Sequence, residues 1–317
     1  MTHVDTETAW RGGQQSLLTL AKGLRARGHI QTIVTPATSA LSERAIAEGF
    51  AVVRKCARNT DIAHAHSGHA HNIALRATLG TKTIRVVTRH VAFAPRHPLI
   101  HRLKYTRTCH GIIAVSDAVR DVLVNAGIPA SHIQVIHTGI ELPPAPMRRA
   151  LHRPLTVAHM GAFTKEKGQD IAIAAARLLP QIRFLMAGEG PLLPGLRESA
   201  TANVEFLGFV SDKAQFFSEV DLFLMPSRSE AWGLAALEAM AYGIPVIASD
   251  IQGLADIIEP GRSGWLIPPG NAAALAHTIA SADPMKFAAA ARLRAEQFSV
   301  ETMARETEQF YAGLLGV

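Results

Sequence analysis

Residues Asp221 to Asp250, DLFLMPSRSEAWGLAALEAMAYGIPVIASD, decide the fold. The apolar run 220–225 predicts a buried strand, and the sequence PSRS at 226–229 breaks it. Helix-forming residues then continue to Tyr242, where Gly243 ends the helix. Pro245 and the apolar residues after it predict a second strand. The stretch is therefore a strand–helix–strand unit of an α/β fold.

The start of this helix is suited to bind an anion. Its first N–H groups have no intrahelical partner, and with the helix dipole they favour a negative charge by about 0.3–2 kcal/mol. Glu230 lies in the loop that enters the helix, and Glu238 follows eight residues later. This spacing predicts that both carboxylates project near one side of the helix and accept hydrogen bonds from hydroxyl groups of one ligand. The alternative is a capping Glu and a solvated helix Glu.

Three segments of the stretch closely resemble the donor-sugar motif of family-4 glycosyltransferases, also called glycosyl transferases group 1. They are residues 229–234 (SEAWGL), 237–241 (LEAMA) and 243–249 (GIPVIAS). Residues 11–13 (RGG) with 24–29 (LRARGH), and 116–119 (SDAV), resemble further parts of the same family. The resemblance implies the GT-B fold, an α/β architecture of two doubly wound Rossmann-like domains that face each other across a cleft.

The resemblance also implies an activity. A protein of this family transfers a sugar from a nucleotide-diphosphate sugar to a hydroxyl acceptor, with retention at the anomeric carbon and with no metal or other cofactor. The expected setting is the synthesis of lipopolysaccharide or another cell-envelope glycan. Two alternatives remain, which are a nucleotide-sugar-binding protein without transferase activity and a sugar epimerase of the same fold.

Donor binding is expected mainly in the second half of the chain. The resemblance implies these donor-binding residues: Gly12, Gly13, Gly161, Lys167, Val210, Glu230, Gly233, Leu234 and Glu238. Lys167 stands just ahead of a predicted helix, where an ammonium group neutralises a diphosphate, although a solvated loop lysine is the alternative. We expect Glu230 to accept hydrogen bonds from the donor sugar and Glu238 from the ribose.

One position departs from the family pattern. Ala162 follows the first glycine of the loop 161–168, where the family usually has an arginine. One of two cations expected on the diphosphate is therefore missing. Lys165 or Arg228 could substitute for it, or else transfer is impaired.

Histidines mark the acceptor side. His90 follows the predicted strand 83–88, and the resemblance places such a histidine at the reaction centre, so Glu230, Lys167 and His90 form the expected catalytic set. The unperturbed pKa of histidine, about 6.5, suits proton transfer at neutral pH, while a surface loop histidine is the alternative. His66 ends another strand and is expected to line the acceptor side.

A histidine cluster in the same half of the chain raises the question of a metal site. The histidines at 64, 66, 69 and 71 have no Cys, Asp or Glu ligand among them, and only the first two share a strand face. We therefore expect no metal site.

Composition sets the domain organisation and the compartment. The chain has 317 residues, of which 48% are hydrophobic, enough for two domains of about 150 residues. A proline-rich linker at 141–154 predicts domains at 1–145 and 146–300, with a helix at 301–317 that packs back on the first. Only Cys56 and Cys109 are present, and no export signal or membrane-spanning run appears, which indicates a cytoplasmic protein.

Charge is divided unevenly. Residues 1–150 hold 19 Lys/Arg against 8 Asp/Glu, whereas residues 151–317 hold 13 against 18. The basic half predicts an anionic partner, and because no nucleic-acid-binding motif is visible we expect a lipid-linked or anionic glycan, or the inner face of the cytoplasmic membrane. The basic, apolar segment 89–110 either lies on such a membrane or is a core-facing helix with a solvated side.

Overall fold

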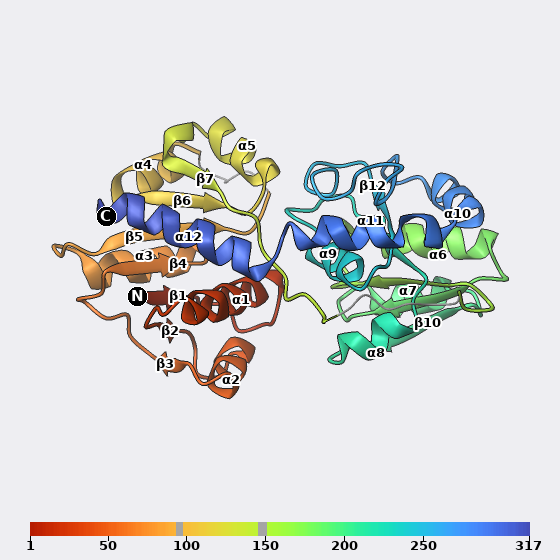
Figure 1. The fold of residues 1–317 in the computed structure, drawn as a ribbon, viewed down its shortest axis with the longest axis horizontal. Helices are drawn as coiled ribbons and strands as arrows, with labels where there is room; N and C mark the ends of the chain where they lie inside the picture. Colours follow the sequence, from red (N-terminus) through yellow and green to blue (C-terminus); the bar gives the residue numbers. More distant parts are fainter. Residues whose placement is uncertain (93–97, 145–150) are drawn as a thin grey trace. The chain divides into compact units, whose positions relative to one another are not determined.

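The computed structural model describes residues 1–92, 98–144 and 151–317 and divides the chain into two compact units (Figure 1). Unit 1 comprises Met1–Glu141 and Phe298–Val317, and unit 2 comprises Leu142–Gln297. The predicted boundary at 145/146 falls among residues 145–150, which lie outside the described residues, as do residues 93–97 of the basic, apolar segment.

Unit 1 is built on a seven-stranded parallel sheet with the strand order β3-β2-β1-β4-β5-β6-β7. The strands are β1 (Thr2–Val4), β2 (Thr32–Val34), β3 (Ala51–Val53), β4 (Ile62–Ala65), β5 (Ile84–Arg89), β6 (Gly111–Ala114) and β7 (Ile133–Val135). The helices are α1 (Gly12–Ala26), α2 (Ala40–Ala47), α3 (Gly68–Thr78), α4 (Pro98–Thr108), α5 (Asp117–Asn125) and α12 (Val300–Leu315). Because β1 and β4 are neighbours from which the chain winds in opposite directions, their carboxyl ends form the switch point where ligands of such sheets bind.

The last helix, α12, belongs to unit 1 although it is distant in sequence, and Figure 1 shows it beside α1. Close packing of the two helices depends on Gly23, because a Cβ there would lie 2.8 Å from the Cβ of Ala304. Ser299 caps the helix by accepting a hydrogen bond from the N–H of Thr302 at 3.2 Å. Unit 1 therefore draws its core from both ends of the chain.

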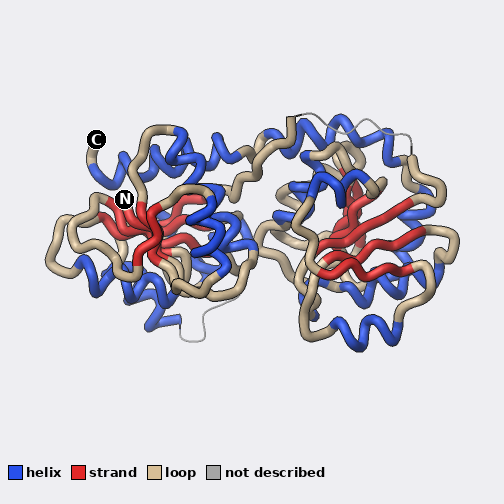
Figure 2. The backbone as a smooth tube through the Cα atoms, turned by 90° about the horizontal axis from the view of Figure 1, so that it is seen from below, coloured by secondary structure: helices blue, strands red, loops and turns tan. Residues whose placement is uncertain are grey.

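Unit 2 repeats the architecture with a six-stranded parallel sheet of order β10-β9-β8-β11-β12-β13. The strands are β8 (Thr156–Met160), β9 (Arg183–Ala187), β10 (Val204–Gly208), β11 (Leu222–Met225), β12 (Val246–Ser249) and β13 (Gly264–Ile267). The helices are α6 (Gln169–Leu178), α7 (Leu193–Ser199), α8 (Lys213–Ser218), α9 (Leu234–Ala241), α10 (Ala272–Ser281) and α11 (Pro284–Glu296). In each unit the strands form a twisted central layer with helices on both sides (Figure 2).

The two sheets are the doubly wound α/β layers that the sequence predicts. Central strands such as β11 and β12 are buried on both faces because helices cover both sides of the sheet there. Residues 252–257, which follow β12, form turns rather than another strand. Gly253 has φ 95°, which a strand does not accommodate. None of the helices in the described part of the chain has the length and apolar character needed to cross a membrane.

Candidate functional site

Unit 2 brings Lys167 and Glu230 together at the carboxyl ends of β8 and β11, the switch point of its sheet. The Nζ atom of Lys167 lies 2.5 Å from Oε1 of Glu230, and the Ser227 hydroxyl donates to the same oxygen at 3.2 Å. The Glu230 side chain is 7% exposed and that of Lys167 29%. A carboxylate this buried needs a cation, so the pair holds both side chains in place.

Direct contact between the two loops positions this pair. Gly168 has φ 69°, and any Cβ there would clash with the carbonyl oxygen of Pro226 in the facing loop. The N–H of Arg228 donates to the carbonyl oxygen of Glu166 at 2.7 Å. The 3-10 turn Lys165–Lys167 is thereby fixed against the loop that carries Glu230.

A buried histidine supports the loop 161–168 from below. Nδ1–H of His159 donates to the carbonyl oxygen of Leu224 at 2.9 Å, so its Nε2 accepts from the Gln169 amide at 3.1 Å. The same amide donates to the carbonyl oxygen of Ala162 at 2.9 Å. Burial lowers the pKa of His159 to about 4, so the ring is neutral at pH 7. Gly161 lies close to this ring, since a Cβ on it would be 3.5 Å from Nε2.

The missing arginine at Ala162 is not replaced by Arg228 in this arrangement. Arg228 forms a two-pronged ion pair with Asp170 at 2.8 and 2.6 Å, and this pairing raises the pKa of its guanidinium group. Lys165 is exposed on the same loop. Lys165, the other residue expected to substitute for the arginine, is not part of this ion pair with Asp170.

Glu238 occupies a different position from the one that helical spacing predicts. The eight-residue spacing does not place the two carboxylates on one side of a helix, because Glu230 lies in the loop before α9, which begins at Leu234 after Gly233 at φ 78°. Glu238 instead pairs with Lys213 at 2.6 Å, and its side chain is 11% exposed. Sequence reasoning missed Lys213, the first residue of α8, whose only signal is its place three residues after Val210 in the segment that follows β10.

The amino end of α9 lies where the sequence predicts an anion site. No side chain caps this helix, and Gly233 at the N-cap adopts the left-handed conformation. A Cβ on Gly233 would lie 2.5 Å from Cδ2 of Leu254, so the backbone here has room for no larger residue. The N–H groups at Leu234 and after it therefore face outward from a helix end close to Glu230 in the chain.

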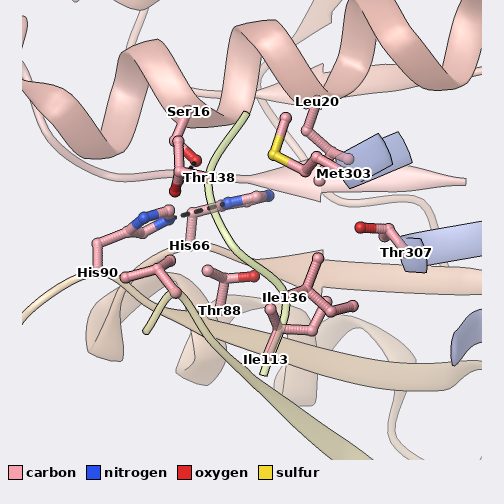
Figure 3. Close-up of a pocket in the computed structure, with 11 residues that line it drawn as sticks. Ser16, Leu20, His66, Thr88, His90, Ile113, Ile136, Thr138, Met303 and Thr307 are labelled. Atoms are coloured by element: carbon pink, nitrogen blue, oxygen red, sulfur yellow. Dashed lines mark hydrogen bonds between the residues drawn. The ribbon is translucent and has the colours of Figure 1, made fainter. Parts of the chain in front are cut away.

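Unit 1 brings His90, His66 and Gly13 together at its own switch point. His90 follows β5 and His66 follows β4, and Nδ1 of His66 lies 3.4 Å from Nε2 of His90 (Figure 3). A Cβ on Gly13 would be 3.6 Å from the His90 ring, whereas Gly12 has open space around it. A cavity of about 10 Å³, room for about one water molecule, borders both histidines and Thr138.

The prediction that His90 has a pKa suited to proton transfer at neutral pH is wrong. Burial, together with the charge of Arg89, lowers the pKa of His90 to about 4. A ring with this pKa is neutral at pH 7 and a weak base. Its chemistry is that of a hydrogen-bond partner.

The histidines that cluster in the structure are not the four that lie close together in the sequence. His64 and His66 do share a face, with ring centroids 4.1 Å apart, and His3 from β1 joins them. His69 is exposed and His71 bonds to Thr108 instead. The sequence analysis missed His3, although its place in an apolar first strand is a signal, because parallel pairing sets it beside His64.

Asp5 is a third residue that sequence reasoning missed. It lies at the carboxyl end of β1, almost fully buried, where burial raises the pKa of its carboxyl group. The N–H of Glu7 donates to it at 2.9 Å and the Gln14 amide at 3.2 Å. Asp5 therefore joins the loop after β1 to the first turn of α1, which begins with Gly12 and Gly13.

Two family models match the two halves of the chain. The model described as Glycosyltransferase Family 4 matches residues 10–142, and that described as Glycosyl transferases group 1 matches residues 154–282. The amylovoran biosynthesis glycosyltransferase AmsK of Erwinia amylovora is 31% identical over 267 residues, which are 74% of this chain and 66% of AmsK. The putative colanic acid biosynthesis glycosyltransferase WcaL of Escherichia coli is 31% identical over 190 residues, 54% of this chain and 47% of WcaL. The chain thus spans about two thirds or less of the length of the curated relatives it matches.

The fold also matches solved structures over the whole chain. The crystal structure of Anabaena HepE in complex with UDP and glucose has a TM-score of 0.87 at 22% identity, covering 98% of each chain. The two parallel Rossmann-like sheets are therefore those of the GT-B fold.

Proposed function

Because the chain belongs to the family 4, group 1 glycosyltransferases, we propose that it transfers a sugar from a nucleoside-diphosphate sugar to a hydroxyl acceptor. The observation that carries this proposal is the Lys167–Glu230 pair at the switch point of unit 2. In this pair, Lys167 supplies a cation for the diphosphate, and Glu230 supplies a hydrogen-bond acceptor for the sugar hydroxyl groups.

The chemistry of transfer assigns a role to each part of this site. Negative charge grows on the departing diphosphate, and Lys167 with the N–H groups at Gly233 and Leu234 would stabilise it more strongly in the transition state than in the bound donor. Glu230 would accept hydrogen bonds from the sugar, and Glu238 from the ribose. Because these groups meet the diphosphate charge themselves, we propose that transfer needs no metal ion, which activity in excess EDTA tests.

The first donor to try is a uridine nucleotide, because the solved structure of HepE holds UDP and glucose. We propose retention at the anomeric carbon, in keeping with the family resemblance. Proton NMR of the fresh product decides this point, since an inverted anomer contradicts it.

We assign the acceptor to unit 1, where His66 and His90 lie beside Gly13. The names of AmsK and WcaL refer to amylovoran and colanic acid biosynthesis, which supports a cell-envelope glycan as the product. The basic excess of the first half supports an acceptor that is anionic or linked to an anionic lipid.

Helix α4 supports contact with the inner face of the cytoplasmic membrane. Its buried side holds Tyr105, while Leu99, Ile100 and Leu103 are 73%, 64% and 53% exposed. The same helix carries Arg102, Lys104 and Arg107. Exposed apolar side chains among basic ones suit a surface of anionic lipid. Sedimentation with phosphatidylglycerol vesicles, but not with phosphatidylcholine alone, is the expected result, and binding that ignores salt would contradict it.

Release of nucleoside diphosphate tests the proposal as a whole. The purified protein is incubated with UDP-sugars and a lipid extract, and UDP is followed by a coupled assay. We expect acceptor-dependent release that falls at least about 100-fold in Lys167→Met and Glu230→Gln, because each removes a charged contact to the transition state. Arg262→Met, which also removes a cation but at an exposed position, serves as the control.

A nucleotide-sugar-binding protein without transferase activity is the second candidate. Ala162 and the three-residue strand β1 favour it, because they weaken the diphosphate site and the first loop. Tight donor binding with no release of nucleoside diphosphate under any acceptor would establish this candidate. Conversion of one UDP-sugar into another without acceptor would instead identify an epimerase.

A further inference from the structure

A chain of side-chain hydrogen bonds runs through unit 1 from Gln31 to His90. The Gln31 amide nitrogen donates to the carbonyl oxygen of Ala21 at 2.9 Å, and its Oε1 lies 2.9 Å from Nε2 of His3. Nδ1 of His3 lies 3.1 Å from Nε2 of His66, and Nδ1 of His66 lies 3.4 Å from Nε2 of His90. His3 and His66 are almost fully buried. Three imidazoles are thus joined in series below the candidate acceptor site.

The hydrogen bond between Gln31 and His3 fixes which atom donates in each of the later hydrogen bonds. If the Gln31 amide were reversed, its oxygen would face the carbonyl oxygen of Ala21, and two acceptors would be opposed. Oε1 of Gln31 therefore faces His3 and can only accept, so Nε2 of His3 carries the proton. A neutral imidazole has one N–H, and burial lowers the pKa of His3 to about 4. Nδ1 of His3 is consequently an acceptor.

The same reasoning assigns the donor and the acceptor in the next two hydrogen bonds. Nδ1 of His3 accepts from Nε2–H of His66, whose pKa burial lowers well below its usual value. Nδ1 of His66 then has no proton and accepts from Nε2–H of His90. His90 is left with an unprotonated Nδ1. Among the described residues, the structure gives this atom no hydrogen-bond partner.

We propose that Gln31, His3 and His66 are positioning residues that hold His90 in its Nε2–H tautomer, so that Nδ1 offers a lone pair to a hydroxyl group of the carbohydrate acceptor. This inference rests on the proposed function for the identity of the ligand, and on unit 1 alone for the tautomer. In this arrangement the neutral His90 accepts a hydrogen bond from the hydroxyl group of the carbohydrate. The hydrogen bond orients the oxygen atom of that hydroxyl group.

A metal ion is the competing explanation of the cluster. Ligating atoms of His3, His64 and His66 lie within 4.8 Å of one another. However, His64 bonds through Nε2 to Thr88 and through Nδ1 to Tyr311, both at 2.6 Å. All six ring nitrogens of the three histidines therefore have partners, and a metal bound to all three rings would have to break at least two of these hydrogen bonds.

The tautomers are measured directly by long-range proton–nitrogen NMR on the full chain with ¹⁵N-histidine at neutral pH. We expect His3, His66 and His90 each to show a protonated Nε2 and an unprotonated Nδ1. The signals are assigned by their loss in single His→Gln variants, and exposed His277 gives the reference for an unrestrained ring. A protonated Nδ1 on His90 would overturn the proposal, as would a Co²⁺ absorption spectrum that disappears in His3→Gln.

A matched pair of variants tests causation. Gln31→Met removes the acceptor for His3 and lets the tautomers of all three rings mix, whereas Gln309→Met, the same change at an exposed position of α12, should leave the tautomer of His90 unchanged. If the tautomer of His90 is the same in both variants, these residues do not position it. Should Gln31→Met fail to fold, His66→Leu against His66→Asn, whose amide oxygen can replace Nδ1, supplies the same comparison.

This readout separates the inference from the proposed function. If the chain transfers no sugar, the NMR pattern still decides the tautomer. If it does transfer sugar, Gln31→Met should lower kcat/KM for the acceptor by about 2- to 10-fold, the loss expected for one neutral hydrogen bond, while KM for the donor stays the same. An equal loss for donor and acceptor would indicate a merely structural role.

Discussion

Replacing His159 by Asn should make unit 2 less sensitive to acid. His159 is fully buried below the loop 161–168, and burial lowers its pKa from the ordinary value of 6.5 to about 4. The unfolded chain therefore binds a proton at a higher pH than the folded chain does. The stability contributed by the neutral ring is present in full above about pH 6.5 and is lost as the pH falls toward about 4, in total about 3 kcal/mol.

The substitution removes this titration while it keeps the contact. An Asn amide nitrogen can replace Nδ1–H as the donor to Leu224, so folding at neutral pH should cost only about 1–2 kcal/mol. Between about pH 6 and about pH 4.5, the free energy of unfolding of the wild type should fall more steeply than that of His159→Asn, by about 1.4 kcal/mol per pH unit.

Urea unfolding followed by tryptophan fluorescence measures this slope for unit 2 alone. The chain has three tryptophans, and Trp232 and Trp265 are in unit 2. Trp10→Phe removes the tryptophan fluorescence of unit 1 and keeps an aromatic ring beneath Arg44. His277→Asn, on the exposed side of α10, is the control and should leave the slope unchanged. Parallel pH profiles for wild type and His159→Asn would refute the reasoning, because the buried ring would then titrate like an exposed one.

Three further predictions address the site and the surface. Lys167→Met should weaken UDP binding by about 10- to 100-fold in calorimetry, because one charged hydrogen bond to the diphosphate is lost, and unchanged affinity would remove Lys167 from the site. Gly233→Ala should destabilise unit 2 by about 2–4 kcal/mol in urea unfolding, because the new Cβ would overlap Leu254 and the backbone has a φ of 78°. Gly261→Ala is the control, because Gly261 has a φ of 74° but open space around it, and it should cost only about 1 kcal/mol. Leu103→Ser should reduce partition onto phosphatidylglycerol vesicles about 10-fold or more, as a buried Leu side chain is worth about 1.5–3 kcal/mol, and unaltered sedimentation would show that α4 does not insert.

The sequence predicts the elements of this fold closely because each leaves a local pattern. The strand Ile84–Arg89 and the helix Val300–Leu315 lie within one or two residues of the predicted 83–88 and 301–317. Short apolar runs between Gly and Pro define buried parallel strands without any knowledge of their neighbours. The placement of Glu230 and Lys167 at strand ends follows from the same patterns.

What the sequence does not predict depends on contacts between distant strands. His3 reaches His66 only because β1 pairs with β4, and Lys213 reaches Glu238 only through the end of β10. Helical spacing does not relate the two glutamates, because Glu230 lies in the loop before Gly233, whose left-handed conformation precedes the first residue of α9. The low pKa of His90 likewise comes from burial, which a strand-end position does not reveal.

The most direct test of the donor site compares two ligands on one substitution. Calorimetry measures the affinity of wild type and Glu230→Gln for the nucleoside diphosphate with the largest thermal shift and for its sugar derivative. If Glu230 binds the sugar while Lys167 binds the diphosphate, Glu230→Gln should lose about 10-fold or more in affinity for the nucleotide sugar and little or none for the nucleoside diphosphate. Equal affinities of wild type and variant for both ligands would contradict the assignment of this ion pair to donor binding.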